Sequence, residues 1–323
     1  MKLALTLLVR DEIDVIDEFL GYHLDAGVDV IIATDHRSAD GTTGVLQRYA
    51  ATGRVHVIRR DDELIDQSRW VTEMARLAAT EHGADWVINS DADEFWWPRE
   101  GSLKSTLAAV PLPYGVVYNV SRVFVPRPGS EPWSERLTVR LALHAPINDT
   151  ATPYRHVAKV AHRAHSHAVV RQGNHRVDGV PYRELRGWSP LELLHFPLRS
   201  PEQAAGKHER TWSAWRVNLR GDLARARATR AAGSTTTFYD SLLVEDGAVA
   251  SGLAAGYVEQ DTRLRDALRM LRRSERLSFE PTYERDASRA VDAVLLAEAD
   301  VVRLHRRADE LAARIAVYGS ARP

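Results

Sequence analysis

The N-terminal part of the chain alternates apolar runs with helical periodicity, and this alternation constrains the fold more than any other feature. Residues 3–9 and 28–33 are continuously apolar, as strands covered on both faces would be. Between them, over residues 13–24, apolar residues recur at spacings of three and four, which is typical of a helix. The alternation continues with a helix at 40–53, a strand at 54–58, a helix at 66–82 and a strand at 85–90. This order predicts an α/β fold with a parallel sheet wound in the right-handed sense.

Acidic side chains follow the ends of three of these predicted strands. They are Asp11, Glu12, Asp35, Asp91, Asp93 and Glu94. Ligands of open α/β sheets bind outside the carboxyl ends of the strands. The sequence therefore predicts that separate segments deliver carboxylates to one edge of the sheet.

Asp91 and Asp93 are two residues apart, directly after the strand at 85–90. Alternate side chains of extended backbone point the same way, so both carboxylates are expected to face one cation. Mg²⁺ and Mn²⁺ take oxygen ligands and often bridge to substrate phosphates. We therefore predict a divalent metal site here, with a solvated loop as the alternative.

Composition excludes several classes of partner and site. Among 323 residues, 43 Lys and Arg nearly cancel 44 Asp and Glu, so no overall positive field favours nucleic acid. The absence of cysteine excludes disulfides and thiolate metal sites and fits a reducing compartment. No apolar run approaches the ~20 residues of a membrane helix, and we expect a cytoplasmic protein without a transmembrane segment.

The remainder of the chain changes character twice. Residues 115–198 are rich in strand patterns and include a predicted hairpin that turns at Gly173 and Asn174. From residue 201 onward the sequence is mostly helical and rich in Ala and Arg. A heptad pattern over 285–316 predicts a helix that either forms a homodimer or packs on its own domain.

The segment LVRDEIDVIDEFLGYHLDAGVDVIIATDHRSADGTTGVLQRYAATGRVHVI, followed by DWVINSDADEF, resembles the family-2 glycosyltransferases of the GT-A fold. It is most similar to the subgroup with the pattern NE…WxxYHxxxGv…DNxSxDGT…DxDEF. The resemblance covers residues 2–97 and reappears in LLHFPLRSPEQAAGK at 193–207. It implies a GT-A domain with a Rossmann-like sheet over 1–200 and a helical C-terminal extension over 201–323.

The resemblance also implies roles for individual residues. Asp35 falls where the family contacts the nucleobase, usually uracil, beside Asp11 and Glu12 of the first loop. Asp91 falls where the motif reaches the ribose and the metal, and Asp93 where it binds the metal. His195 falls where a late histidine completes the metal shell, and Arg199 and Lys207 where cations meet the diphosphate.

Some features limit these assignments. Asp11 stands where asparagine is usual, and His36 and Arg37 replace a more typical Asn-x pair, so the nucleobase is less well specified. Asp35 also suits a helix cap or turn, and Arg199 and Lys207 also suit surface charges. An imidazole beside carboxylates favours Mn²⁺ over Mg²⁺.

An inverting transferase, which the resemblance favours, needs a base to take the acceptor's proton. Glu94 and His175 are our candidates, and spacing does not choose between them and three other carboxylates: Asp178, Glu184 and Glu192.

The sequence thus predicts a metal-dependent glycosyltransferase that moves a sugar from a nucleotide donor, a UDP-sugar, to an unknown small-molecule or glycan acceptor. Three alternatives stay open: a nucleotidyltransferase, a metal-dependent nucleotide-sugar phosphohydrolase, and a non-catalytic nucleotide-sugar-binding or scaffold protein.

Overall fold

A computed structural model of the protein describes residues 1–143, 156–185, 189–206, 242–274 and 277. Its elements, in chain order, are β1 (Leu3–Val9), α1 (Ile16–Asp25), β2 (Val30–His36), α2 (Thr42–Ala50), β3 (Val55–Arg60), α3 (Gln67–Thr80), β4 (Trp86–Ser90), β5 (Glu94–Pro98), α4 (Leu103–Ala108), β6 (Tyr114–Val123), α5 (Trp133–Arg136), β7 (Val139–Leu141), β8 (Ala158–Arg163), β9 (Val169–Val170), the 3-10 turn η1 (Gln172–Asn174), β10 (Val177–Asp178), β11 (Arg183–Leu185), β12 (Leu191–His195), α9 (Asp246–Ala255), β13 (Val258–Gln260) and α10 (Arg263–Arg272).

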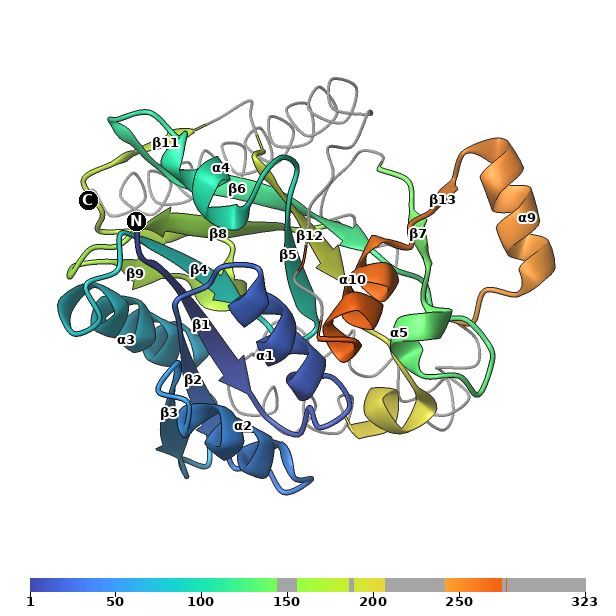
Figure 1. Ribbon diagram of the computed structural model, residues 1–323, viewed down its shortest axis with the longest axis horizontal. Helices are drawn as coiled ribbons and strands as arrows, with labels where there is room; N and C mark the ends of the chain where they lie inside the picture. The colour runs from blue at the N-terminus through green and yellow to red at the C-terminus, as the bar shows by residue number, and fades with distance from the viewer. Residues whose placement is uncertain (144–155, 186–188, 207–241, 275–276, 278–323) are drawn as a thin grey trace, which may run out of the picture.

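The centre of the fold is a mixed sheet with the strand order β3-β2-β1-β4-β8-β6-β12-β5 (Figure 1). The first four strands of this order, β3, β2, β1 and β4, are parallel to one another, as the alternation of strands and helices predicts. β8 then pairs antiparallel with both β4 and β6, and β5 pairs antiparallel with β12. The α/β fold class predicted from the sequence is confirmed.

The continuous apolar character of β1 reflects burial on both faces of the sheet. Leu5 and Leu7 belong to one core cluster, which also contains the buried apolar residues of α1, while Ala4 belongs to a second cluster that contains Val71, Met74, Ala75 and Ala78 of α3. Each leucine removed from water in this way stabilises the fold by about 2 kcal/mol.

Most predicted element boundaries agree with the structure within a few residues. The first helix begins at Ile16 and not near residue 13, because the backbone N–H groups of Val15 and Ile16 both donate to the carbonyl of Glu12 and form a turn there. The predicted hairpin is confirmed: β9 and β10 are antiparallel and η1 connects them. None of the described helices is long and apolar enough to cross a membrane.

The described part of the C-terminal region packs on the N-terminal part. α10 contacts α1 and α5. β13 lies in the region that the sequence predicts to be mostly helical, and it pairs antiparallel with β7. α9 lies at the periphery (Figure 1). The predicted helix at 285–316 lies outside the described residues, and the domain boundary at residue 200 stays a prediction.

Candidate active site

The candidate site lies where β1, β2 and β4 end, at Val9, His36 and Ser90. Their parallel direction brings the three following loops to the same edge of the sheet. β12 supplies a further side chain, because its register with β5 sets His195 opposite Glu94. Parallel strand ends thus position acidic loops from distant parts of the sequence.

The acidic segment after β4 is a turn. The N–H of Glu94 donates to the carbonyl of Asp91 at 3.2 Å, and β5 begins only at Glu94. The expectation that extended backbone directs Asp91 and Asp93 to one face is therefore wrong. The two carboxylates have different surroundings: the side chain of Asp91 is 34% exposed and that of Asp93 is 4% exposed.

Asp93 lies against the late histidine. Its Oδ2 is 3.6 Å from Nε2 of His195, and the N–H of Phe196 donates to the Asp93 carbonyl at 2.9 Å. Nδ1 of His195 is buried and has no hydrogen-bond partner among the described residues. The structure thus brings together two of the three predicted metal ligands.

Arg199 is a buried cation that joins several acidic residues. Its guanidinium donates to Asp14 through Nε at 2.7 Å and Nη2 at 2.9 Å, and to Glu12 through Nη2. Nη1 donates to the Phe196 carbonyl at 3.1 Å and lies 3.8 Å from Oδ2 of Asp93. Since protein groups engage this side chain and it is fully buried, its predicted contact with a diphosphate stays a prediction.

Asp91 and Glu94 share a second buried cation, Lys159 of β8. Nζ of Lys159 is 2.6 Å from Asp91 Oδ2 and 3.0 Å from Glu94 Oε1. Burial raises the pKa of Glu94 to about 7, although the Lys159 ammonium opposes this shift. Burial alone would lower the pKa of Lys159, but Asp91 and Glu94 raise it, so the ammonium stays charged.

Asp35 lies at the end of β2 and is fully buried. It accepts hydrogen bonds from the Thr43 hydroxyl at 2.6 Å and the Ser38 N–H at 3.2 Å. The loop after β1 is linked to Asp35 through Ser38, because the Asp11 N–H donates to the Ser38 hydroxyl at 3.0 Å. These contacts fit a turn-stabilising role and leave the predicted nucleobase contact untested.

The remaining candidate residues lie in varied surroundings. His175 is exposed, and its Nδ1 is 2.8 Å from the Ala158 carbonyl. Asp178 pairs with Arg171 and Arg176, and Glu184 accepts from the Tyr118 hydroxyl. Lys207 lies outside the described residues.

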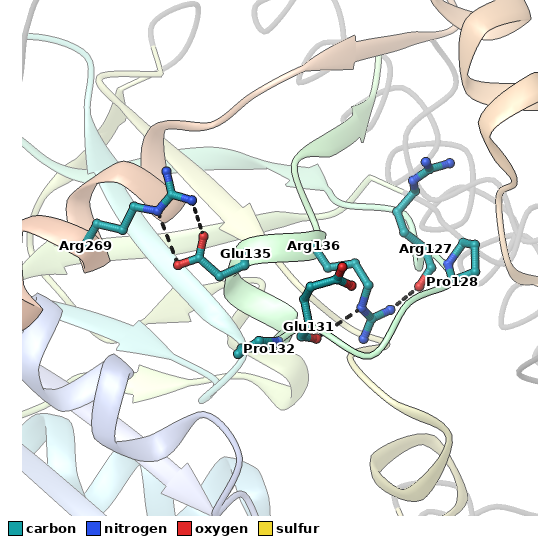
Figure 2. A pocket seen from close by; sticks show the side chains of 7 residues that line it. All are labelled: Arg127, Pro128, Glu131, Pro132, Glu135, Arg136 and Arg269. Atoms are coloured by element: carbon teal, nitrogen blue, oxygen red, sulfur yellow. Dashed lines mark hydrogen bonds and ion pairs between the residues drawn. The ribbon is translucent and has the colours of Figure 1, made fainter.

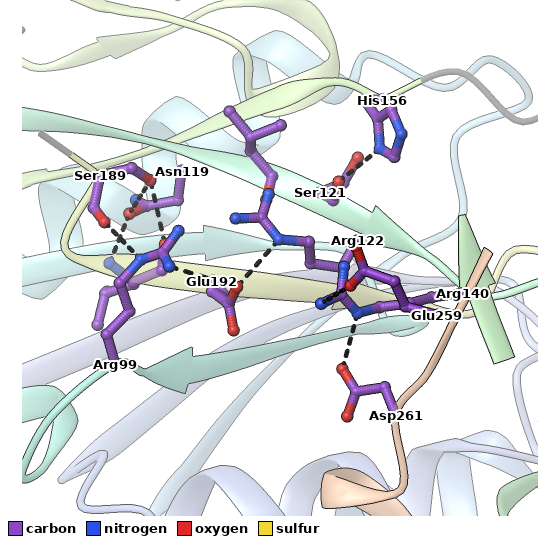
Figure 3. Close-up of polar contacts among 12 residues, drawn as sticks. Arg99, Asn119, Ser121, Arg122, Arg140, His156, Ser189, Glu192, Glu259 and Asp261 are labelled. Atoms are coloured by element: carbon purple, nitrogen blue, oxygen red, sulfur yellow. Dashed lines mark hydrogen bonds and ion pairs between the residues drawn. The ribbon is translucent and has the colours of Figure 1, made fainter. Parts of the chain in front are cut away.

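Glu192 is buried among arginines (Figure 3). Burial would raise its pKa, but Arg122, Arg263 and Arg99 hold that pKa well below the usual value. A carboxylate so firmly ionised is a poor proton acceptor, which disfavours Glu192 as the base.

Two cavities lie in this region, one against the Asp11 loop and the other beside the Arg199 backbone. The first, of about 480 Å³, is lined by residues that include Asp11, Asp14, Asp40, Ser200, Glu202 and Gln203. The second, of about 490 Å³, lies among Arg127, Glu131, Glu135, Arg136 and Arg269 (Figure 2). Glu135 pairs with Arg269, and Arg136 donates to the Arg199 carbonyl at 2.8 Å, so the second cavity adjoins the buried arginine.

The donor atoms at Asp93 and His195 fit a divalent metal in part. The described residues contain no group of three or more His, Asp or Glu side chains that could hold an ion. The Asp93 carboxylate and the Nε2 of His195 that faces it supply two ligands. Such cations are commonly held by one or two carboxylates and completed by substrate phosphates and water. The mixed oxygen and nitrogen set favours Mn²⁺.

The sequence analysis missed three side chains of this site: Lys159, Asn174 and Asp14. Lys159 is a single lysine in the apolar strand segment HVAKVAH, and a charge at a buried strand position could have identified it. Asn174, which lies in η1, donates a hydrogen bond to Asp91 Oδ1 at 3.3 Å. Asp14 had no distinguishing spacing, and only the fold brings it to Arg199.

No protein-family model and no curated protein matches the chain. Among solved structures, the 1–349 fragment of S. aureus TarS aligns with 94% of this chain and 92% of its own length, at 12% identity and a TM-score of 0.35. The same fragment in complex with UDP-GlcNAc aligns over 51% of this chain and 46% of its own, at 14% identity and a TM-score of 0.29. Glucosyl-3-phosphoglycerate synthase from Mycobacterium tuberculosis, in complex with Mn²⁺, UDP and phosphoglyceric acid, aligns over 38% and 43%, at 18% identity and a TM-score of 0.26. In the last two alignments the chain spans less than half of the matched structure, and similarity at these TM-scores supports no conclusion about activity.

Proposed function

We propose that this protein is a metal-dependent glycosyltransferase of the GT-A type, which transfers a sugar from a UDP-sugar donor to an acceptor with inversion. The observation that most supports the proposal is the approach of His195 Nε2 to within 3.6 Å of Asp93 Oδ2. The resemblance implied this pair from two sequence segments about a hundred residues apart. Without a relationship to that family, we would not expect these two distant segments to place Asp93 and His195 side by side.

The surroundings of the pair fit the chemistry of sugar transfer. Asp93 and His195 would hold Mn²⁺, which would neutralise the negative charge that develops on the departing diphosphate. Arg199 adds a buried positive charge 3.8 Å from Asp93. Asp35 on β2 and Asp91 directly after β4, the two strands that flank β1, are proposed to orient the base and the ribose of the nucleotide. A donor oriented in this way reacts without the entropic cost of a free encounter.

The acceptor's proton requires a base near the reacting carbon. We propose Glu94 or His175. Burial brings the pKa of Glu94 to about 7, within the range in which a carboxylate accepts protons efficiently. The His175 side chain is exposed and so reaches solvent. Glu94→Gln and His175→Gln, tested separately, distinguish them: the variant that loses sugar transfer and retains UDP binding identifies the base.

The test of the proposed function is calorimetric titration of UDP and GDP into the purified protein, with Mn²⁺ or with EDTA. We expect UDP to bind in the presence of Mn²⁺, and Asp93→Asn or EDTA to weaken this binding about a hundredfold, roughly 2.7 kcal/mol. Asp17→Asn is the matched control, because Asp17 is an exposed carboxylate of α1, and it should bind UDP as the wild type does.

Absence of nucleotide binding by the folded wild type would contradict the transferase proposal and favour the scaffold alternative. Where UDP binds, a screen of UDP-sugars follows. Release of a sugar phosphate without any acceptor would indicate the phosphohydrolase instead.

A further inference from the structure

We propose that Lys159 is a positioning residue of this site. Together with Asn174, it fixes the Asp91 carboxylate to accept hydrogen bonds from hydroxyl groups of the nucleotide and keeps that carboxylate from binding a divalent cation. The inference rests on the proposed function, because it concerns the same site. It adds to that site two side chains that the family resemblance did not supply.

Lys159 lies on a strand of the central sheet and is buried. It lies on β8, opposite Asn119 of β6, and is only 4% exposed. Its ammonium donates to Asp91 at 2.6 Å and lies 3.0 Å from Glu94. A lysine so deeply buried needs a carboxylate partner to stay charged, and these two carboxylates satisfy that requirement.

Asn174 holds the other oxygen of the same carboxylate. Its Nδ2 is 3.3 Å from Asp91 Oδ1, and the residue is 1% exposed. The contact between His175 and the Ala158 carbonyl ties this turn to β8, so both contacts to Asp91 come from one connected segment. The Asn174 amide oxygen is buried without a partner among the described residues, which leaves an acceptor beside Asp91.

These contacts determine what Asp91 can still bind. A carboxylate has about four lone-pair sites, and Lys159 and Asn174 use one each. The side chain is 34% exposed, so sites remain open to a ligand. A divalent cation at these sites would be repelled by the ammonium, which is already 2.6 Å from Asp91. A neutral hydroxyl donor experiences no such repulsion, and Asp93 and His195 are left as the protein's metal ligands.

The experiment titrates Mn²⁺ alone into the full chain and follows free Mn²⁺ by electron paramagnetic resonance. The variants are Asp91→Asn, Asp93→Asn, Lys159→Met and Lys159→Arg. We expect Asp93→Asn to weaken Mn²⁺ binding about tenfold or more and Asp91→Asn to change it less than about twofold. Lys159→Met should tighten Mn²⁺ binding by about threefold or more, because Asp91 is then released as a further ligand.

A second measurement, UDP binding at saturating Mn²⁺, separates positioning from mere stability. Lys159→Met should weaken UDP binding about tenfold, the equivalent of one hydrogen bond to a charged group, and Lys159→Arg should restore it. Thermal unfolding of each variant checks the fold. If Lys159→Met does not fold, the comparison of Asp91→Asn with Asp93→Asn still decides.

The proposal is overturned if Asp91→Asn weakens Mn²⁺ binding as much as Asp93→Asn, or if folded Lys159→Met binds UDP as the wild type does. These failures differ from failure of the proposed function. A wild type that binds Mn²⁺ through Asp93 and not through Asp91, but never binds UDP, contradicts the transferase and the nucleotide contact of Asp91, and it retains only the part of the proposal in which Lys159 keeps Asp91 from binding the cation. A wild type that binds neither overturns both.

Discussion

Two buried charge clusters adjoin β12, one through His195 and the other through Glu192. Acids outnumber cations in the first, and cations outnumber acids in the second. The site cluster contains the cations Lys159 and Arg199 and the acids Glu12, Asp14, Asp91, Asp93 and Glu94. The arginine cluster contains Glu192 and Asp261 with Arg99, Arg122 and Arg140 (Figure 3). Arg263, which pairs with both acids, also belongs to it. Glu192 and His195 are three residues apart, so they point to opposite faces of the strand.

In the arginine cluster, the guanidinium groups of the cluster itself pair with its buried carboxylates. Oε1 of Glu192 accepts from Arg122 at 3.0 Å, and its Oε2 lies 2.5 Å from Arg263, so both oxygens are engaged by guanidinium groups. Arg263 also contacts Asp261 at 2.7 Å, and its contact with Glu192 of β12 connects the start of α10 to the sheet. This arrangement fits a purely structural role.

The site cluster is different, because its acids outnumber its cations and Asp14 and Asp91 remain about one-third exposed. Excess negative charge in this cluster is unfavourable unless a further cation binds, and Asp93 is the acid of the cluster that we propose as its ligand. The comparison suggests that charge imbalance combined with access, and not burial of charge alone, distinguishes a ligand site from a structural cluster.

The largest expected effect is in the arginine cluster. Glu192→Gln removes the carboxylate between Arg122 and Arg263 and leaves buried guanidinium charge uncompensated. We expect it to lower the free energy of unfolding by about 3–5 kcal/mol, measured by urea denaturation. UDP binding at saturating Mn²⁺ should be unchanged in the folded protein. A loss of UDP binding without a loss of stability would reverse the roles that we assign to the two clusters.

A smaller loss is expected from Arg199→Met in the site cluster. Asp14 is 32% exposed and Glu12 13% exposed, so water can solvate part of their charge, and we expect a loss of about 2 kcal/mol. Added Mn²⁺ should restore more stability to this variant than to Glu192→Gln, because a bound cation offsets the acidic charge that loss of Arg199 leaves uncompensated and cannot offset the guanidinium charge left by loss of Glu192. Thermal unfolding with Mn²⁺ and with EDTA measures the difference, and equal responses would contradict the comparison.

The sequence predicts much of the frame on which these clusters lie. Hydrophobic periodicity is local, so the alternation of strands and helices through Ser90 was accessible, as was the hairpin at Gly173 and Asn174. The resemblance then named Asp93 and His195, which the structure brings close together. These predictions depended on short-range patterns or on motif residues.

The unpredicted features depend on contacts between distant segments. Lys159 is 68 residues from Asp91 in the sequence, and nothing local to β8 indicates that it inserts antiparallel between β4 and β6. Asp14 is 185 residues from Arg199. The turn at Asp91 was mistaken for extended backbone because spacing alone does not reveal where a strand ends. Which distant residues come into contact across a sheet cannot be predicted from local sequence patterns and is known only from the tertiary structure.

Acidification has a smaller expected effect on the arginine cluster. The arginines hold the folded-state pKa of Glu192 well below 4.5, its ordinary value, although burial opposes this. Its contribution to stability is therefore fully present above about pH 4.5 and is lost as pH falls through the folded-state pKa. The stability difference between wild type and Glu192→Gln should be constant from neutral pH to about pH 5 and shrink below it. Denaturation at a series of pH values measures this, and a difference that grows on acidification would contradict the assignment.

The smallest effect is expected for an exposed ion pair, which serves as the reference for the buried charge pairs of both clusters. Arg48 and Asp17 form an ion pair at 3.2 Å on the surface, with side chains 64% and 60% exposed. Arg48→Ala should cost about 0.5 kcal/mol or less, because water solvates both charges and salt screens them. The measurement is urea denaturation at low and at high salt, where even this cost should decline. A cost comparable to that of Glu192→Gln would show that burial does not set the strength of charge pairs in this protein, and the distinction between the clusters would then need a different physical cause.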